Sequence, residues 1–75
     1  MNEKEIEILQ AALASGTTIY WCPDGDTCEP VISVSLRHGY GTALCALFPH
    51  GFIPLSEAHL ADFWEMRRLA AKEEA

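Results

Sequence analysis

The sequence contains no apolar run long enough to cross a membrane. The longest nearly apolar stretch extends from Thr42 to Phe48, whereas a helix that spans a bilayer needs about 20 apolar residues. The first residues, Met1 to Glu5, are polar and acidic, and no apolar segment typical of a secretory signal follows them. We therefore expect a cytoplasmic protein that does not associate with membranes.

Basic residues are scarce. Five lysines and arginines stand against eleven aspartates and glutamates, which gives a formal net charge of −6 at pH 7. A phosphate backbone would repel so acidic a chain, and this argues against direct nucleic-acid binding. The acids are spread along the chain rather than gathered in a tail, so they favour solubility and attraction toward a basic protein surface.

Glycine and proline are also few. The 75 residues include 5 glycines and 4 prolines, and 49% of them are hydrophobic. Collagen-like, low-complexity and disordered chains are poorer in core-forming residues or richer in glycine and proline. We therefore expect one small domain over residues 1–75, whose single core gives only marginal stability.

The three cysteines are too few for a secreted disulfide scaffold, and their number is odd. Five residues separate Cys22 from Cys28, whereas zinc knuckles place roughly two to four residues between paired thiolates. No second cysteine or histidine lies at metal-ligand spacing from His38, Cys45 or His50. The sequence therefore predicts no metal site and no cofactor. We expect Cys22 and Cys28 to meet across two strands and to stay reduced in the cytosol, and Cys45 to be a small buried hydrophobic residue.

Catalytic motifs are absent as well. The segment 39–41 has two glycines but lacks the third glycine and the following helix of a phosphate-binding loop, and no nucleophile elbow is present. We therefore expect that the protein is not an enzyme. The alternative is a small thiol-dependent enzyme or redox protein that uses Cys45 or the Cys22/Cys28 pair.

Three carboxylates lie close together in the sequence, at Asp24, Asp26 and Glu29. Their spacing begins like a calcium-binding loop, but Cys28 occupies the third ligand position and Glu29 the place of the required glycine. The pattern instead indicates a solvated acidic hairpin tip, which a basic partner could contact.

A helix is predicted over residues 2–15. Asn2 is in position to cap it, and Glu5, three residues later, completes a capping box. Ile6, Leu9 and Leu13 share one face of this helix. Gly16 then supplies the left-handed conformation that ends a helix.

Three strands are predicted next, over residues 17–22, 31–37 and 42–48, with a brief fourth strand over 52–53. The connections between the first three are short enough for an antiparallel meander. Strand 42–48 is apolar on both faces, as is typical of a central strand.

The register of the meander decides which apolar side chains lack cover. If Ile32, Val34 and Leu36 meet the helices, the outward residues of strand 42–48 are one of two sets: Leu44, Ala46 and Phe48, or Cys45 and Leu47. Either set indicates an exposed apolar patch and hence a partner, unless the segment 52–55 covers it. A homodimer that pairs sheet faces or edge strands would complete the small core.

A second helix is predicted from Ser56, as its cap, to about residue 72. Its apolar residues form one broad arc: Leu60, Phe63, Trp64, Met66 and Ala70. The expected fold is therefore α+β: an N-terminal helix, a three- to four-stranded antiparallel meander and a C-terminal helix, with both helices packed on one sheet face.

The side chains expected to contact a partner are the two tryptophans, the carboxylates of the hairpin tip and one arginine: Trp21, Trp64, Asp24, Asp26, Glu29 and Arg67. Tryptophan and arginine are frequent at binding hot spots. For Arg67 the alternative is that its aliphatic stem packs on the helix face while the guanidinium group reaches water.

The functional hypothesis is a small intracellular binding module, a homodimer that occludes a basic surface of a protein partner, for example a nucleic-acid-binding protein. Size, acidity and the lack of catalytic motifs are similar, in general terms, to those of small inhibitors encoded by phages and mobile elements, including nucleic-acid mimics and anti-CRISPR proteins. A self-associating structural subunit without any other partner is a further interpretation.

Overall fold

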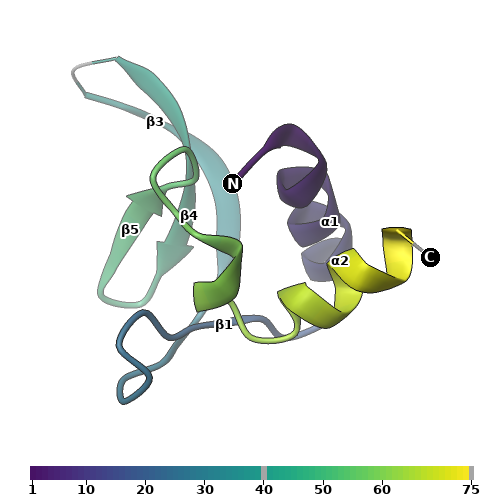
Figure 1. Ribbon diagram of the computed structural model, residues 1–75. Coiled ribbons are helices and arrows are strands. Elements are labelled where there is room, and N and C mark those ends of the chain that lie inside the picture. Colours follow the sequence, from purple (N-terminus) through teal and green to yellow (C-terminus); the bar gives the residue numbers. More distant parts are fainter. Residues whose placement is uncertain (40, 75) are drawn as a thin grey trace.

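The computed structural model describes residues 1–39 and 41–74, and it has the α+β fold that the sequence predicts (Figure 1). The elements follow one another in this order: α1 (Glu3–Ala14), β1 (Tyr20–Trp21), β2 (Glu29–Pro30), β3 (Ser33–His38), β4 (Thr42–Phe48), β5 (Gly51–Pro54), a short 3-10 helix η1 (Leu60–Asp62) and α2 (Met66–Glu74). None of the helices in the described residues is both long and apolar enough to span a bilayer.

The ends of α1 are set by the residues that the sequence singles out. The Glu5 backbone N–H donates to the Asn2 side chain at 2.8 Å, and the Asn2 N–H donates to the Glu5 carboxylate at 3.0 Å, which completes the predicted capping box. Gly16 has a φ of +85°, so the predicted left-handed stop is confirmed. Leu9 and Ala12 are the buried residues of the helix.

The larger sheet has three antiparallel strands in the order β3-β4-β5, so the predicted central strand and brief fourth strand are both confirmed. Ala46 lies between Val34 and Ile53, and these side chains belong to the core or pack against it. Cys45, one position away, lies between Ser35 and Pro54 on the opposite face. The register therefore turns Cys45 and Leu47 away from the helices, but Cys45 is 1% exposed and Leu47 is half-buried, so the exposed apolar patch expected on this strand is not found.

The strand predicted over 17–22 does not join this meander. Only Tyr20 and Trp21 form a strand, and they pair with Pro30 and Glu29 in a separate two-stranded sheet. The missing N–H of Pro30 costs this ladder no bond, because Pro30 and Tyr20 form a non-hydrogen-bonded pair in which that group would point away from β1. After Val31, whose N–H still bonds to the Ile19 carbonyl at 2.8 Å, the chain leaves β1 and enters β3.

The second helix is shorter than predicted, and its expected start at Ser56 is wrong. The chain passes through η1, then an extended Phe63 that bridges to Trp21, and then Glu65 at a φ of +77°, before α2 begins at Met66. The Trp64 N–H bonds to the Tyr20 carbonyl at 2.8 Å, and this strand-like pairing replaces the helical hydrogen bonds. Long-range pairing thus overrides the helical periodicity of the segment.

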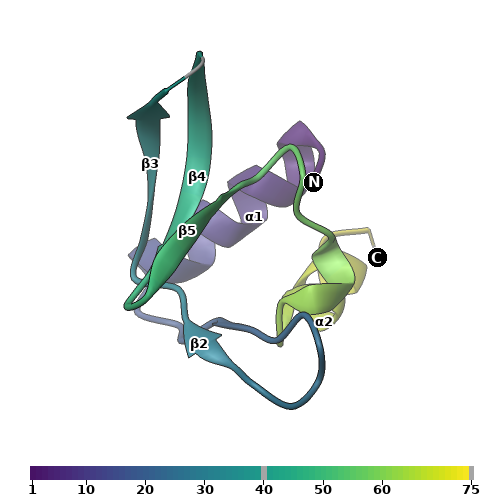
Figure 2. The ribbon, with the colours of Figure 1, turned by 90° about the vertical axis from the view of Figure 1, so that its left-hand side faces the viewer.

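The helices occupy one side of the larger sheet, as Figure 2 shows. Helix α1 packs against β3, whereas α2 packs mainly on α1 and η1. The core lies between these layers and contains residues of α1, β4 and α2 and of the segments between the elements: Leu9, Ala12, Ile19, Val31, Ala46, Phe48, Leu55, Ala58, Phe63 and Met66. The amino group of Met1 also joins the layers, because it donates to the carbonyls of Leu55 and Ala58, each at 2.8 Å.

One expectation about β3 is wrong in part. Val34 packs against the core, but Ile32 and Leu36, predicted on the same face, are 62% and 61% exposed. Leu36 is exposed because it lies in the outer part of the β3–β4 hairpin, which extends beyond α1 and which no helix covers (Figures 1 and 2). Ile32 precedes the first residue of β3 and lies at the other end of the strand.

Candidate functional site

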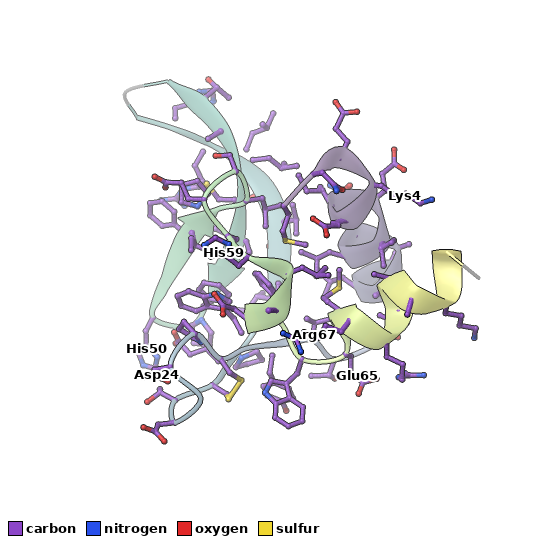
Figure 3. The ribbon with its side chains drawn as sticks, viewed as in Figure 1. Lys4, Asp24, His50, His59, Glu65 and Arg67 are labelled. Atoms are coloured by element: carbon purple, nitrogen blue, oxygen red, sulfur yellow. A yellow bond between two sulfur atoms is a disulfide. The ribbon has the colours of Figure 1, made fainter. Side chains whose placement is uncertain are left out.

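The six residues expected to contact a partner do not form one cluster. Trp64 and the two aspartates of the loop between β1 and β2 are exposed, Trp21 and Glu29 are half-buried, and Arg67 is exposed on α2. Figure 3 shows Arg67 and Asp24 on different parts of the molecule. The six predicted residues therefore do not make up a single binding surface.

Trp21 is a packing residue that joins the two sheets. Its ring stacks on Phe48 of β4 with 4.7 Å between ring centroids and an interplanar angle of 8°. On the other side of β1, Trp21 pairs with the buried Phe63. The indole Nε1 is buried and has no hydrogen-bond partner among the described residues. This arrangement gives Trp21 a structural role that the sequence alone left open.

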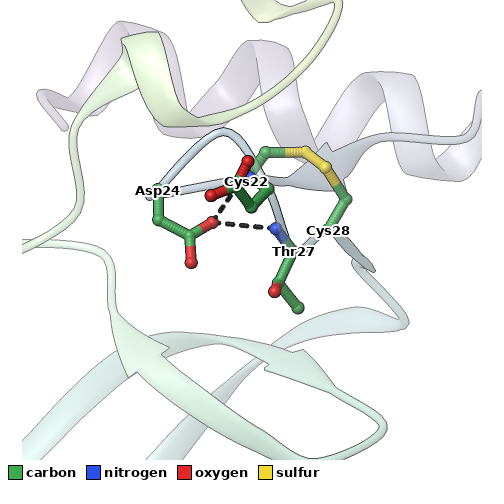
Figure 4. The surroundings of a disulfide bond; sticks show 5 residues. Cys22, Asp24, Thr27 and Cys28 are labelled. Carbon is green, nitrogen blue, oxygen red and sulfur yellow. Dashed lines mark hydrogen bonds between the residues drawn. A yellow bond between two sulfur atoms is a disulfide. The ribbon is translucent and has the colours of Figure 1, made fainter.

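The loop between β1 and β2 is held by a disulfide bond and by Asp24 (Figure 4). Cys22 and Cys28 are joined, so the expected contact across the strands is confirmed but the expected reduced state is not what the structure contains. The Asp24 carboxylate accepts hydrogen bonds from the N–H groups of Asp26 and Thr27, both at 2.9 Å. These bonds, that of Thr27 first, hold the pKa of Asp24 below its ordinary value.

Glu29 is not at the tip of the acidic loop. One oxygen of its carboxylate accepts from the His50 backbone N–H at 3.2 Å and lies 2.8 Å from His50 Nδ1. His50 stands in the turn between β4 and β5, so this contact ties the small sheet to the large one. The role of Glu29 is therefore an internal one, and the exposed acids of the loop are Asp24 and Asp26.

Tyr20 and Trp64 form an exposed aromatic pair. The bridge between Trp21 and Phe63 turns those two side chains inward, so that their neighbours Tyr20 and Trp64 point to the opposite side. Tyr20 is 44% exposed and Trp64 64% exposed. Tyr20 also pairs with the exposed Pro30 across β1 and β2.

We call this the aromatic–acidic surface: Tyr20, Pro30 and Trp64, together with Asp24 and Asp26 of the disulfide loop that connects Tyr20 to Pro30. The sequence left Tyr20 open between a core and an interface position, and it gave no sign of Pro30 as a member. The signal that could have found Tyr20 is the alternation of Ile19, Tyr20 and Trp21, in which the outer two side chains face the core. The position of Trp64 opposite Tyr20 depends on long-range pairing and left no such signal.

Arg67 belongs to a different region. It lines a shallow hollow beside the start of α1, together with Asn2, Glu5 and Leu60. Its neighbour Arg68 donates from Nε to the Glu65 carboxylate at 2.9 Å. The predicted partner contact of Arg67 is thus not part of the aromatic–acidic surface.

The free thiol is poorly accessible to a substrate. Cys45, the free cysteine, is 1% exposed, and its Sγ donates to the Ala43 carbonyl at 3.5 Å. This confirms the prediction of a small buried residue. Within residues 1–39 and 41–74, no three histidine, cysteine or acidic side chains come together in a way that could hold a metal ion.

Comparison of the chain with protein-family models, with curated proteins and with solved structures finds no match. The interpretation of the aromatic–acidic surface therefore depends on its geometry and charge.

Proposed function

We propose that this protein is a small binding module whose aromatic–acidic surface docks on a basic segment of another protein. The observation that carries the proposal is the exposed pair of Tyr20 and Trp64, fixed to each other by a backbone hydrogen bond of 2.8 Å. Single exposed apolar residues are common on a protein surface, whereas neighbouring exposed aromatic residues on paired backbone segments indicate a partner.

The aromatic pair suits binding because its backbone is already ordered. Tyr20 lies between two neighbours, paired with Pro30 on one side and bonded to Trp64 on the other. A preordered surface loses less conformational entropy on association, and tyrosine and tryptophan are the residues that most often dominate binding energy.

The charge around the pair selects the partner. No lysine or arginine occurs between Lys4 and Arg37, so every charged side chain of β1, β2 and the loop between them is negative. Asp24 stays ionised to lower pH than an ordinary aspartate because two backbone N–H groups bond to it. Arginine or lysine of a partner could meet these carboxylates and also lie over the Trp64 ring in a cation–π contact.

Selection from a random peptide library, displayed on phage and captured by the oxidised protein, tests this proposal. We expect the selected peptides to be rich in arginine and lysine and to be released by salt. Trp64→Ala should weaken binding of a synthesised winner by about tenfold or more. Phe52→Ala is the matched control, since Phe52 is 51% exposed but lies on the larger sheet.

Two results would contradict the proposed function. One is the selection of neutral or acidic peptides whose binding does not depend on ionic strength. The other is equal loss of binding in the Trp64→Ala and Phe52→Ala variants, which would place the peptide elsewhere or show a general effect on the fold.

A further inference from the structure

Strand β3 is an open edge of the larger sheet. It pairs with β4 on one side, and no other strand of the described residues pairs with its second side. Natural proteins protect such edges with proline, with several charged residues or with a covering segment. Strand β3 has no proline and no acid, and Arg37 is its one permanently charged residue.

The ladder with β4 fixes which backbone groups face the open side. The Gly39 N–H bonds to the Gly41 carbonyl at 2.9 Å, next to the non-hydrogen-bonded pair of His38 and Thr42. Since the two pair types alternate, Ser35 and Arg37 direct their N–H and C=O groups to β4. Val34 and Leu36 direct theirs outward, so they offer two donors and two acceptors to an added strand.

The side chains at this edge are apolar and poorly covered. Leu36 projects from the outer part of the hairpin, and Ile32 stands at the base of β3. Beside Ile32 the edge carries a groove between β3 and the end of α1, lined by Gln10, Leu13, Ala14, Ile32, Ser33 and Val34. The edge therefore combines a projecting leucine with a partly apolar groove a few residues away.

We propose that a second copy of this chain adds its own β3 antiparallel to this edge, about a two-fold axis at Ser35. In this register Val34 lies opposite Leu36 of the second copy, and the outward N–H and C=O groups of these two residues bond to each other. Leu36 of each copy then enters the groove beside Val34 of the other. The contact is isologous and closed, and the two three-stranded sheets become one sheet of six strands.

Charge and shape both favour a second copy as the occupant. The register places Arg37 opposite Ser33 of the second copy and keeps the two arginines apart, so no like charges meet and no acid is buried. In this register Leu36 of one copy faces Val34 of the other, and Val34 lines the groove. The strand is therefore complementary to a second copy of itself. An unrelated strand would need an outward leucine at the same position.

Amide hydrogen exchange, followed by NMR as a function of protein concentration, tests the register in the unmodified protein. We expect the Val34 and Leu36 amides to exchange at least about tenfold more slowly at high concentration, as dimer forms, because they are free in a single copy. The Ser35 and Arg37 amides, bonded to β4, should stay protected throughout. Unchanged exchange at Val34 and Leu36 up to the highest concentration would overturn the proposal.

Sedimentation equilibrium on two variants gives the second measurement. Leu36→Lys should raise the dimer dissociation constant by about tenfold or more, because it sets a charge against Val34 of the second copy. Trp64→Lys is the matched control, with nearly equal exposure of the original side chain, and should leave the constant within about twofold. Dissociation by Trp64→Lys alone would place the second copy on the aromatic–acidic surface and overturn the edge pairing. A protein that stays monomeric would also overturn the edge pairing, but it would leave the proposed peptide binding by the aromatic–acidic surface unaffected.

Discussion

At the scale of single residues, Trp21 shows how a functional-looking side chain can be structural. Tryptophan on a short strand beside an acidic loop fits a binding hot spot as well as a core position. The structure stacks it on Phe48, and its buried Nε1 lacks a partner among the described residues. Trp21 therefore stabilises the fold through the packing of its ring, and its N–H group contributes no hydrogen bond.

This leads to a prediction with two substitutions. Trp21→Ala should lower the free energy of unfolding by about 3 kcal/mol, because it removes the stacked ring and leaves a cavity between the sheets. Trp21→Phe should cost about 1 kcal/mol or less, since it keeps an aromatic ring and removes the unpaired N–H group. Urea unfolding of both variants measures the difference. Equal losses would contradict the prediction, because they would show that the aromatic ring kept by phenylalanine adds nothing to the stability.

Asp24 gives a prediction about pH. Its pKa is lowered in the folded protein, chiefly by the N–H of Thr27, from an ordinary value of 3.8. The stabilisation by the carboxylate is therefore complete above the ordinary pKa and is lost as the pH falls through the lowered pKa. The Thr27 amide resonance should shift with a midpoint below 3.8 in an NMR titration. In Asp24→Asn the acceptor oxygen stays and the titration should vanish; a midpoint above 3.8 would contradict the assignment.

At the scale of elements, local signals are the ones that the sequence carries well. The capping box of Asn2 and Glu5 and the stop at Gly16 need only neighbouring residues, and the structure contains both. The central position of β4 also follows from local composition, because apolar residues on both faces suit a strand with two neighbours.

The second helix could not be predicted because its decisive contact is distant in sequence. The segment 56–65 has helical spacing of its apolar residues, yet Phe63 pairs with Trp21 across more than half of the chain. That pairing buries Phe63 and turns Trp64 outward beside Tyr20. The pairing of Phe63 with Trp21 thus both shortens the helix and brings Trp64 beside Tyr20. The aromatic pair could therefore not be predicted from the sequence, for the same reason as the start of the helix.

The disulfide loop gives a prediction at this scale. Cys22 and Cys28 are six positions apart, so their bond closes a small ring and should add about 2 kcal/mol to the stability through loop-closure entropy. Reduction should lower the free energy of unfolding by that amount in urea titrations with and without a phosphine reductant. The double variant Cys22→Ser and Cys28→Ser should not respond to reductant. Equal stability of the oxidised and reduced protein would show that the disulfide bond does not stabilise the fold.

At the scale of the whole molecule, two small sheets share one core. Trp21 and Phe48 stack between them, and the contact of Glu29 with His50 joins their edges. Composition predicted one small domain with a net negative charge, since both depend on sums over the chain, and the order of the local patterns predicted the α+β fold. It could not predict the division into two sheets, because β1 pairs with β2 across the disulfide loop and with the distant Phe63 on its other side, and composition determines neither partner.

The two proposed interfaces should respond to salt in opposite directions. Each chain carries a net charge of −6, so two copies repel one another, and added salt should tighten the β3 dimer by screening that repulsion. The aromatic–acidic surface attracts a basic peptide, so the same salt should weaken its binding. Sedimentation equilibrium and peptide titration at about 0.05 M and 0.5 M sodium chloride measure both constants, over which the Debye length falls from roughly 14 Å to roughly 4 Å. A peptide that binds more tightly at high salt would mean that apolar burial by Tyr20 and Trp64 outweighs the carboxylates. A dimer that weakens would mean that the two copies meet through opposite charges, as the acid-free edge of β3 does not allow.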